Sequence, residues 1–161
     1  MKKILVSECL CAGRAVRYDG GRKTLDDPRF LKWHEKGRLI PVCPEILGGF
    51  PVPRPETQLR GGRAFTRDGR EVTRGFVLGA SRTLALALKL GAAFAIMKEN
   101  SPSCGSGFIY DGSFTGTKTP GAGVTAKLLM GNGLRVFSEH DLDEAEAFLN
   151  ALEAVPPPSP L

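Results

Sequence analysis

The sequence lacks the closely spaced cysteine and histidine pairs from which most local metal sites are built. Its 161 residues include four cysteines and two histidines, and no two cysteines have exactly two residues between them. The spacings of structural zinc sites and of ferredoxin-type iron–sulfur sites are therefore absent. A metal site in this chain has to draw on cysteines from distant parts of the sequence.

Long apolar runs are also missing. The run at residues 4–6 ends at Ser7 and Glu8, which makes it too short for the core of a signal peptide. The most apolar later stretch, residues 84–97, is interrupted by Lys89 and falls short of a membrane span. We therefore expect a cytoplasmic protein without membrane contact. Its cysteines should be reduced and should serve metal binding or catalysis rather than disulfides.

The chain has no strong excess of charge of either sign. There are 22 Lys and Arg residues against 17 Asp and Glu, and the formal net charge is +5. Aromatic residues make up only 7% of the sequence, and no dense basic stripe is interleaved with them. Nucleic acid is therefore not an expected partner, and the basic residues are expected to form a solvated surface.

The chain does show a repeated alternation of apolar β-type runs and helical segments. We predict strands at residues 3–7, 38–43, 92–98 and 134–137. A first helix is expected from Pro28 to Gly37, with Asp27 as its cap, and a second over residues 73–90. A third is expected after residues 120–121, and a fourth from the capping Asp141 to about Leu152. This alternation is typical of an α/β protein with a Rossmann-like or flavodoxin-like parallel sheet and helices on both faces.

The predicted domain organisation is simple. Residues 1–152 are expected to form a single α/β domain, and residues 153–161 a flexible proline-rich tail. Residues 44–73 are rich in glycine, proline and arginine, and we predict within them a hairpin around Asp68-Gly69. A segment of this length is either a functional lid or a mobile loop.

Three of the four cysteines follow predicted strands. Cys9 comes just after the first strand, Cys43 ends the second, and Cys104 lies in the loop after the third. In a doubly wound sheet, ligands bind beyond the carboxyl ends of the strands, near the point where strand order reverses. A strand order of 2-1-3-4 makes these three strands neighbours, so we expect the three thiols to converge on one spot.

The residues beside these cysteines point to a site rather than to small apolar side chains in a core. Glu45 stands two positions after Cys43, and Ser101 and Ser103 accompany Cys104. Thiols, hydroxyls and a carboxylate at one rim are typical of a functional site. Three thiolates suit either a catalytic zinc ion with an open position or an iron–sulfur cluster with one free iron. The residues alone leave that choice open.

Six sequence blocks occur together in an order that resembles a known family. They are ILVSECL…VRYDG, CPEILGGFPVPRPE, KENSPSCG, IYDGSFTG, PGAGVTAKLL and VFSE. They resemble the thiouracil desulfidase family, small bacterial proteins formerly catalogued as a domain of unknown function. The resemblance extends over nearly the whole chain, up to about Glu139. The chain departs from the family pattern at Cys11, where members commonly have leucine, and at Glu71 and Ala122.

The resemblance implies a cofactor and a reaction. The cofactor is a [4Fe-4S] cluster held by Cys9, Cys43 and Cys104, with one iron not ligated by the protein. The reaction is the non-redox removal of sulfur from a thiolated pyrimidine, converting 2-thiouracil to uracil and hydrogen sulfide. Glu45 would act as the general base and Ser101 as a second catalytic group.

Further expectations concern the rest of the site and its partners. Ser103, Arg54 and Asp19 are predicted to bind substrate or support the site, although Asp19-Gly20 also reads as an ordinary turn. The expected partners are a small thiolated molecule and the iron–sulfur assembly machinery, and we expect a monomer or homodimer. Two alternatives remain: a mononuclear zinc hydrolase using the same cysteines, and a non-catalytic iron–sulfur module for electron transfer. In the latter, Cys11 is the available fourth ligand.

Overall fold

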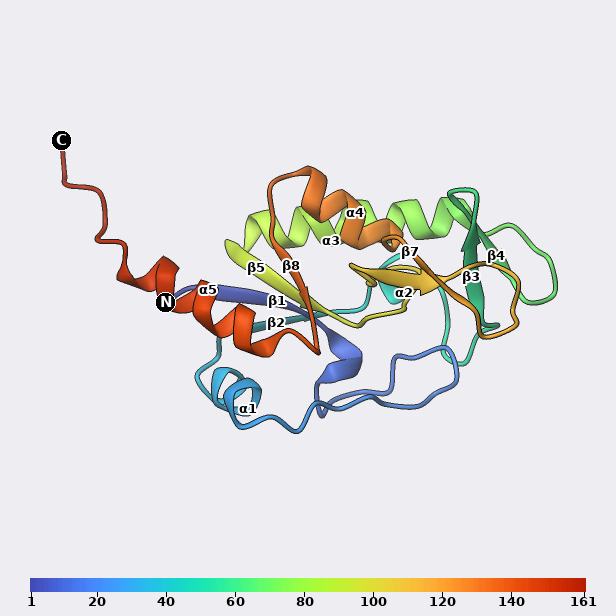
Figure 1. Cartoon of the computed structure of the whole chain (residues 1–161), viewed down its shortest axis with the longest axis horizontal. Helices are drawn as coiled ribbons and strands as arrows, with labels where there is room; N and C mark the ends of the chain where they lie inside the picture. Colours follow the sequence, from blue (N-terminus) through green and yellow to red (C-terminus); the bar gives the residue numbers. More distant parts are fainter.

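The centre of the protein is a four-stranded parallel sheet in the order β2-β1-β5-β8 (Figure 1). The structure is a computed structural model that describes all residues, 1–161. The sheet strands are β1 (Lys3–Ser7), β2 (Leu39–Val42), β5 (Ala92–Met97) and β8 (Val136–Ser138). The prediction of an α/β fold with a parallel sheet in this order is thereby confirmed.

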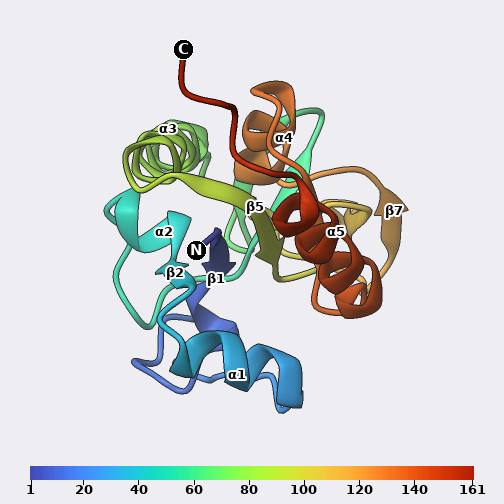
Figure 2. The ribbon, with the colours of Figure 1, turned by 90° about the vertical axis from the view of Figure 1, so that its left-hand side faces the viewer.

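Helices cover both faces of the sheet (Figure 2). Helices α1 (Pro28–Glu35) and α5 (Leu142–Ala154) pack on one face, and α3 (Thr73–Lys89) and α4 (Val124–Gly131) pack on the other. In β1, the side chains of Ile4 and Val6 join the apolar cluster under α1 and α5, whereas Leu5 joins the cluster under α3 and α4. Because both faces are buried, the central strands are apolar without interruption.

The ends of α1 match the signals in the sequence, whereas the start of α5 does not. The Asp27 carboxylate accepts a hydrogen bond from the backbone N–H of Arg29, Pro28 occupies the first position of α1, and Gly37 has a φ of 68° just beyond the helix. Asp141 stands at the start of α5, but its carboxylate accepts hydrogen bonds from the backbone N–H and hydroxyl of Ser138. It therefore closes the turn after β8 instead of capping the helix.

Residues 44–73 form ordered structure rather than a plain loop. A short helix α2 (Pro44–Leu47) is followed by an antiparallel hairpin of β3 (Thr57–Arg60) and β4 (Arg63–Thr66). This hairpin turns at Gly61-Gly62, where both residues have positive φ. At the predicted position, Asp68-Gly69, the chain makes a second tight turn, which closes with a single bridge between Phe65 and Glu71.

A second hairpin, of β6 (Phe108–Tyr110) and β7 (Lys118–Pro120), packs beside the first. The buried Gln58 side chain joins the two, because its Oε1 accepts hydrogen bonds from the backbone N–H groups of Gly112 and Phe114, at 3.1 and 3.2 Å. In Figure 1 the β3–β4 hairpin stands beyond the carboxyl ends of the sheet strands. Together the hairpins supply part of the wall of the site described below.

The remaining elements are a short 3₁₀-helix and the C-terminal segment. The 3₁₀-helix, η1 (Glu8–Leu10), directly follows β1. Helix α5 runs two residues beyond the predicted end, and residues 156–161 extend away from the domain without regular secondary structure (Figure 1). None of the helices combines the length and the apolar character that a membrane crossing requires.

Candidate functional site

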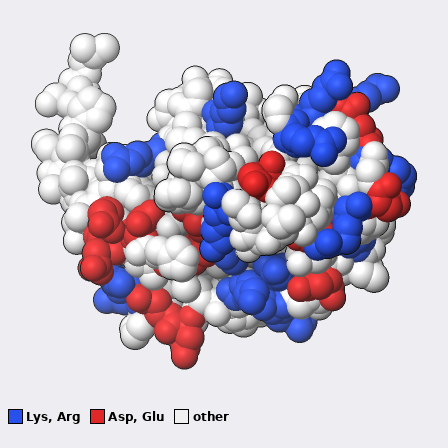
Figure 3. Space-filling model, turned by 45° about the vertical axis from the view of Figure 1, so that its right-hand side comes forward, with Lys and Arg blue, Asp and Glu red and all other residues white.

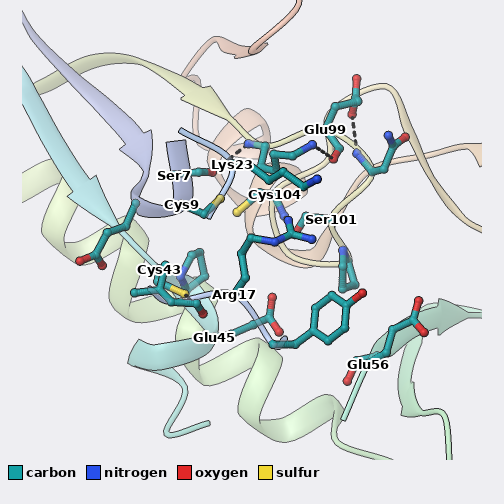
Figure 4. Close-up of a pocket in the computed structure, with 18 of the residues that line it drawn as sticks. Ser7, Cys9, Arg17, Lys23, Cys43, Glu45, Glu56, Glu99, Ser101 and Cys104 are labelled. Carbon is teal, nitrogen blue, oxygen red and sulfur yellow. Dashed lines mark hydrogen bonds between the residues drawn. The ribbon is translucent and has the colours of Figure 1, made fainter. Parts of the chain in front are cut away.

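A cavity of about 300 Å³ opens at the carboxyl ends of β1, β2 and β5. Cys9 follows β1, Cys43 follows β2 and Cys104 lies in the loop after β5, and all three line this cavity (Figure 4). The parallel arrangement of the strands explains this meeting, because the three carboxyl ends lie at the same edge of the sheet. Residues that are 34 and 61 positions apart along the chain thereby become neighbours.

Burial raises the pKa of each of the three thiols. It raises the pKa of Cys9 to about 12, against the nearby charge of Arg17, which lowers it. Burial likewise raises the pKa of Cys43, opposed by backbone N–H groups at the start of α2. The pKa of Cys104 lies well above its ordinary value because of burial, and a hydrogen bond from the Ser7 hydroxyl works in the opposite direction. A metal centre that binds here has to displace the thiol protons.

The donor set fits an iron–sulfur cluster better than a single metal ion. No three His, Cys, Asp or Glu side chains stand close enough together to hold one ion. Zinc–sulfur bonds of about 2.3 Å place the sulfur atoms of a zinc site within about 4 Å of one another. In a cluster the thiolates bind different irons, so three separate loops can each contribute one sulfur at wider spacing.

Glu45 lies in the first turn of α2, directly beside Cys43, and its carboxylate is held from two sides. The Arg54 guanidinium donates a hydrogen bond from Nε to Oε1 of Glu45 at 3.1 Å, and the Ser103 hydroxyl donates to Oε2 at 3.5 Å. The Arg54 side chain is only 6% exposed, and its other nitrogens donate to two backbone carbonyls at 2.8 and 3.0 Å. Arg54 therefore fixes the position of a carboxylate that lines the cavity.

The loop between β5 and β6 is organised by the Ser101 hydroxyl. Its oxygen accepts hydrogen bonds from the backbone N–H groups of Ser103 and Cys104, at 3.1 and 3.0 Å. The start of α4 packs so tightly on this loop that a Cβ on Gly123 would lie 2.4 Å from the backbone of Ser103. Ser101 lines the cavity, whereas Ser103 is buried behind it and contacts Glu45.

Glu99 is a cavity residue that the sequence did not reveal. Its Oε1 accepts hydrogen bonds from four backbone N–H groups of the following loop, those of Asn100, Ser106, Gly107 and Phe108. Its own backbone N–H donates to Glu139, which also forms an ion pair with Lys98 at 2.8 Å. Glu99 thus shapes the loop that carries Ser101 and Cys104. The donors to its carboxylate are backbone N–H groups, which leave no trace in the sequence.

Asp19 and Arg17, two residues of the loop after η1, form an ion pair at 3.5 Å but differ in their relation to the cavity. The Asp19 carboxylate accepts a hydrogen bond from the backbone N–H of Gly21 at 2.8 Å, and this bond lowers its pKa. Asp19 does not line the cavity, so its placement matches the turn rather than a substrate contact. Arg17, which stands in the RYDG stretch of the first sequence block, does line the cavity (Figure 4).

Cys11 lies elsewhere. It is 7% exposed and belongs to the apolar cluster under α1 and α5, together with Trp33 and Phe94. Burial, together with the Glu8 carboxylate, raises the pKa of Cys11 to about 11. This thiol does not line the cavity that the other three share.

Acidic and basic side chains are interspersed on the face drawn in Figure 3. Three arginines of the β3–β4 hairpin and of the turn after it pair with neighbouring carboxylates, in Arg63–Glu71, Arg67–Glu56 and Arg70–Asp68. These ion pairs neutralise basic residues here, which do not form a continuous basic band.

Fold and site together define a class: α/β proteins in which three loops at the carboxyl end of a parallel sheet bring cysteine thiols to one cavity. Within this class, the chain belongs to the 2-thiouracil desulfurase family, whose model matches residues 4–141. The resemblance carried by the six sequence blocks is thereby confirmed.

Two individual proteins illustrate the relationship. The chain is 43% identical over 151 residues to the uncharacterized protein YbbK of Bacillus subtilis (strain 168). The alignment covers 88% of this chain and 98% of the relative. It is also similar to the solved structure of the [4Fe-4S]-dependent thiouracil desulfidase TudS. That match has a TM-score of 0.91 and 43% identity, and it covers 94% of this chain and 99% of the other.

Proposed function

We propose that this protein is a [4Fe-4S]-dependent desulfidase. It removes sulfur from 2-thiouracil or a related thiolated pyrimidine, giving uracil and hydrogen sulfide without net oxidation or reduction. The observation that carries the proposal is the meeting of three thiols with an oriented carboxylate at one cavity. Membership of the 2-thiouracil desulfurase family and the 43% identity to TudS support it.

Cys9, Cys43 and Cys104 are the residues that would hold the cluster. The fourth cysteine, Cys11, is packed in the apolar core, so the chain offers no fourth thiolate at this cavity. A [4Fe-4S] cluster held by these three cysteines would have one iron without a cysteine ligand. When bound, the cluster supplies a Lewis acid for the sulfur of the substrate.

Glu45 takes the proton of the attacking water. Its carboxylate lines the cavity and is held by Arg54 and Ser103, so the oxygen that accepts the proton has a fixed position. The water oxygen attacks the thiocarbonyl carbon, and the second water proton then moves from the added oxygen to the sulfur. The bond from carbon to sulfur breaks, the carbonyl of uracil forms, and the sulfur leaves as hydrosulfide. A positioned general base of this kind typically contributes about 10²- to 10⁴-fold in rate.

Ser101 donates a hydrogen bond into the cavity. Its oxygen already accepts two backbone N–H groups, so the hydroxyl proton is the part that remains for a ligand. Because these two bonds fix the oxygen, the donor is oriented before the substrate arrives.

The decisive experiment compares wild type with Glu45→Gln after anaerobic reconstitution with iron and sulfide. Glu144→Gln, which removes the same group from an exposed position on α5, is the matched control. We expect all three proteins to show the visible absorption of a cluster, and wild type and the control to release sulfide from 2-thiouracil. Glu45→Gln should lose about 10²- to 10⁴-fold in turnover. A loaded wild type that releases no sulfide from any thiolated pyrimidine or nucleoside contradicts the proposal.

The two alternatives left open by the sequence receive less support. A mononuclear zinc hydrolase needs its three thiolates around one ion, and no such compact group is present. An electron-transfer module needs a fourth thiolate, whereas Cys11 lies in the apolar cluster under α1 and α5. Metal analysis of the reconstituted protein separates zinc from iron directly.

A further inference from the structure

Arg17 is a buried cation inside the cavity. It lies in the irregular loop between η1 and α1, and its side chain reaches among the cavity residues labelled in Figure 4. The side chain is only 19% exposed, and its buried Nε makes no hydrogen bond of good geometry, its nearest charged neighbour being the Asp19 carboxylate at 3.5 Å. Its charge lies near enough to Cys9 to lower the pKa of that thiol against the effect of burial.

The other cations of the cavity differ from Arg17 in their partners or their exposure. Arg54 is bonded to Glu45 and to two backbone carbonyls, and Lys98 forms an ion pair with Glu139 at 2.8 Å. Lys23 is exposed. Arg17 forms one ion pair, a long one of 3.5 Å with Asp19, whose carboxylate is 47% exposed and already bonded to a backbone N–H, and its guanidinium lies over the Tyr18 ring at 5.7 Å.

A buried guanidinium with an unsatisfied N–H is costly unless an acceptor reaches it. The carboxylates that line the cavity are bonded to other groups, Glu8 to Arg14, Glu45 to Arg54, Glu56 to Arg67 and Glu99 to backbone N–H groups. The sulfur atoms are the acceptors that gain negative charge when a cluster binds. When the thiols are deprotonated by a cluster, three thiolates outweigh the two positive charges of an oxidised [4Fe-4S] core. The loaded cavity is then anionic and suits a cationic donor.

We propose that Arg17 is a positioning residue that holds anionic sulfur in this cavity, by donating N–H hydrogen bonds to sulfur atoms of the bound cluster. The inference rests on the proposed function for the identity of the cofactor. It assigns to Arg17 an electrostatic consequence that can be measured without substrate. The positive charge stabilises the reduced, more negative state of the cluster more than the oxidised state, so it raises the reduction potential.

The test is the midpoint potential of the reconstituted protein in the absence of substrate. The variants are Arg17→Gln, which removes the charge, and Arg17→Lys, which keeps the charge without the planar fork. The control is Arg22→Gln, which removes an exposed arginine of the same loop that does not line the cavity.

We expect Arg17→Gln to have a more negative potential than wild type. The equilibrium constant for reduction should fall about tenfold, which corresponds to about 59 mV for a one-electron couple. Arg17→Lys should shift by less than half as much. Arg22→Gln should match wild type, because water and salt screen an exposed charge.

Equal potentials in Arg17→Gln and Arg22→Gln would overturn the proposal. If Arg17→Gln folds but does not bind the cluster, the Arg17→Lys variant tests the role of the charge. An Arg17→Lys protein that binds the cluster with a midpoint potential near that of wild type supports this role. If neither variant loads although both keep their far-ultraviolet circular dichroism, Arg17 is a structural residue and the proposal fails. A wild type that loads but does not release sulfide refutes the proposed function, while the potentials still decide the role of Arg17.

Discussion

Two regions of this protein use the same side chain in different ways, although their cysteines stand only two positions apart. Cys9 lines a polar cavity, where burial raises its pKa to about 12 although the nearby charge of Arg17 opposes that shift. Cys11 lies beyond the turn of η1, in the apolar cluster with Trp33, where burial and the Glu8 carboxylate both raise its pKa. Burial opposes the thiolate at both positions, but only Cys9 has a cation beside it and a cavity in which a metal centre can replace its proton. Placement by the backbone, rather than the number of cysteines, therefore decides which thiols can hold a metal centre.

The largest expected effect is in the cavity, where Cys9→Ser should abolish cluster binding. A serine hydroxyl is a poor substitute for a soft thiolate ligand. We expect the reconstituted variant to lack the visible absorption of a cluster and to retain little iron by metal analysis. Its circular dichroism should match that of the wild-type apoprotein, because Cys9 is only partly buried. A Cys9→Ser protein with full iron content would remove Cys9 from the ligand set.

A second prediction concerns Arg54, which holds the cavity carboxylate of Glu45 in position. Arg54→Gln removes the cation that holds Glu45, and it also frees two backbone carbonyls. Breaking a buried ion pair in this way typically costs about 3–5 kcal/mol, so the free energy of unfolding should fall by about 3 kcal/mol. Turnover should fall as well, but by less than in Glu45→Gln, because the carboxylate itself remains.

Urea unfolding of the apoprotein and sulfide release by the loaded protein measure these two effects of Arg54→Gln. Arg74→Gln, at an exposed position on α3, is the control for loss of one positive charge. Unchanged turnover in Arg54→Gln would show that Glu45 does not need this partner to keep its position.

The sequence revealed the sheet because its strands are buried on both faces. Uninterrupted apolar runs marked the four strands, and the alternation with helices led to the strand order and to the meeting of Cys9, Cys43 and Cys104. The hairpins were harder to predict. The strands of the β6–β7 hairpin are three residues long, and the Gly61-Gly62 turn competes with an equally good turn signal at Asp68-Gly69.

The site residues that the sequence missed have a common property: their roles depend on long-range packing. Ser7 looks like the last residue of a strand, yet it lines the cavity, and its hydroxyl donates to the sulfur of Met97 at 3.7 Å and accepts the backbone N–H of Lys98 at 2.8 Å. Arg17 belongs to a loop without periodic pattern. Only the folding of that loop over the sheet end places its charge among the thiols.

The smallest expected effect is in the core, where Cys11→Ser should change stability but not cofactor content. The substitution places a hydroxyl among apolar side chains, which costs about 1–3 kcal/mol when the group finds no partner. Cys11→Ala, which leaves a small void but no unsatisfied hydroxyl, should cost less. Urea unfolding of the two apoproteins measures the difference.

Iron content and sulfide release of reconstituted Cys11→Ser then test the contrast between the two cysteines directly. Both should equal the wild-type values, because Cys11 does not line the cavity. A folded Cys11→Ser protein that has lost its cluster would make Cys11 a ligand, which would leave no open iron for a substrate sulfur. The electron-transfer reading would then gain over the desulfidase, because a fully ligated cluster has no position at which the substrate can bind.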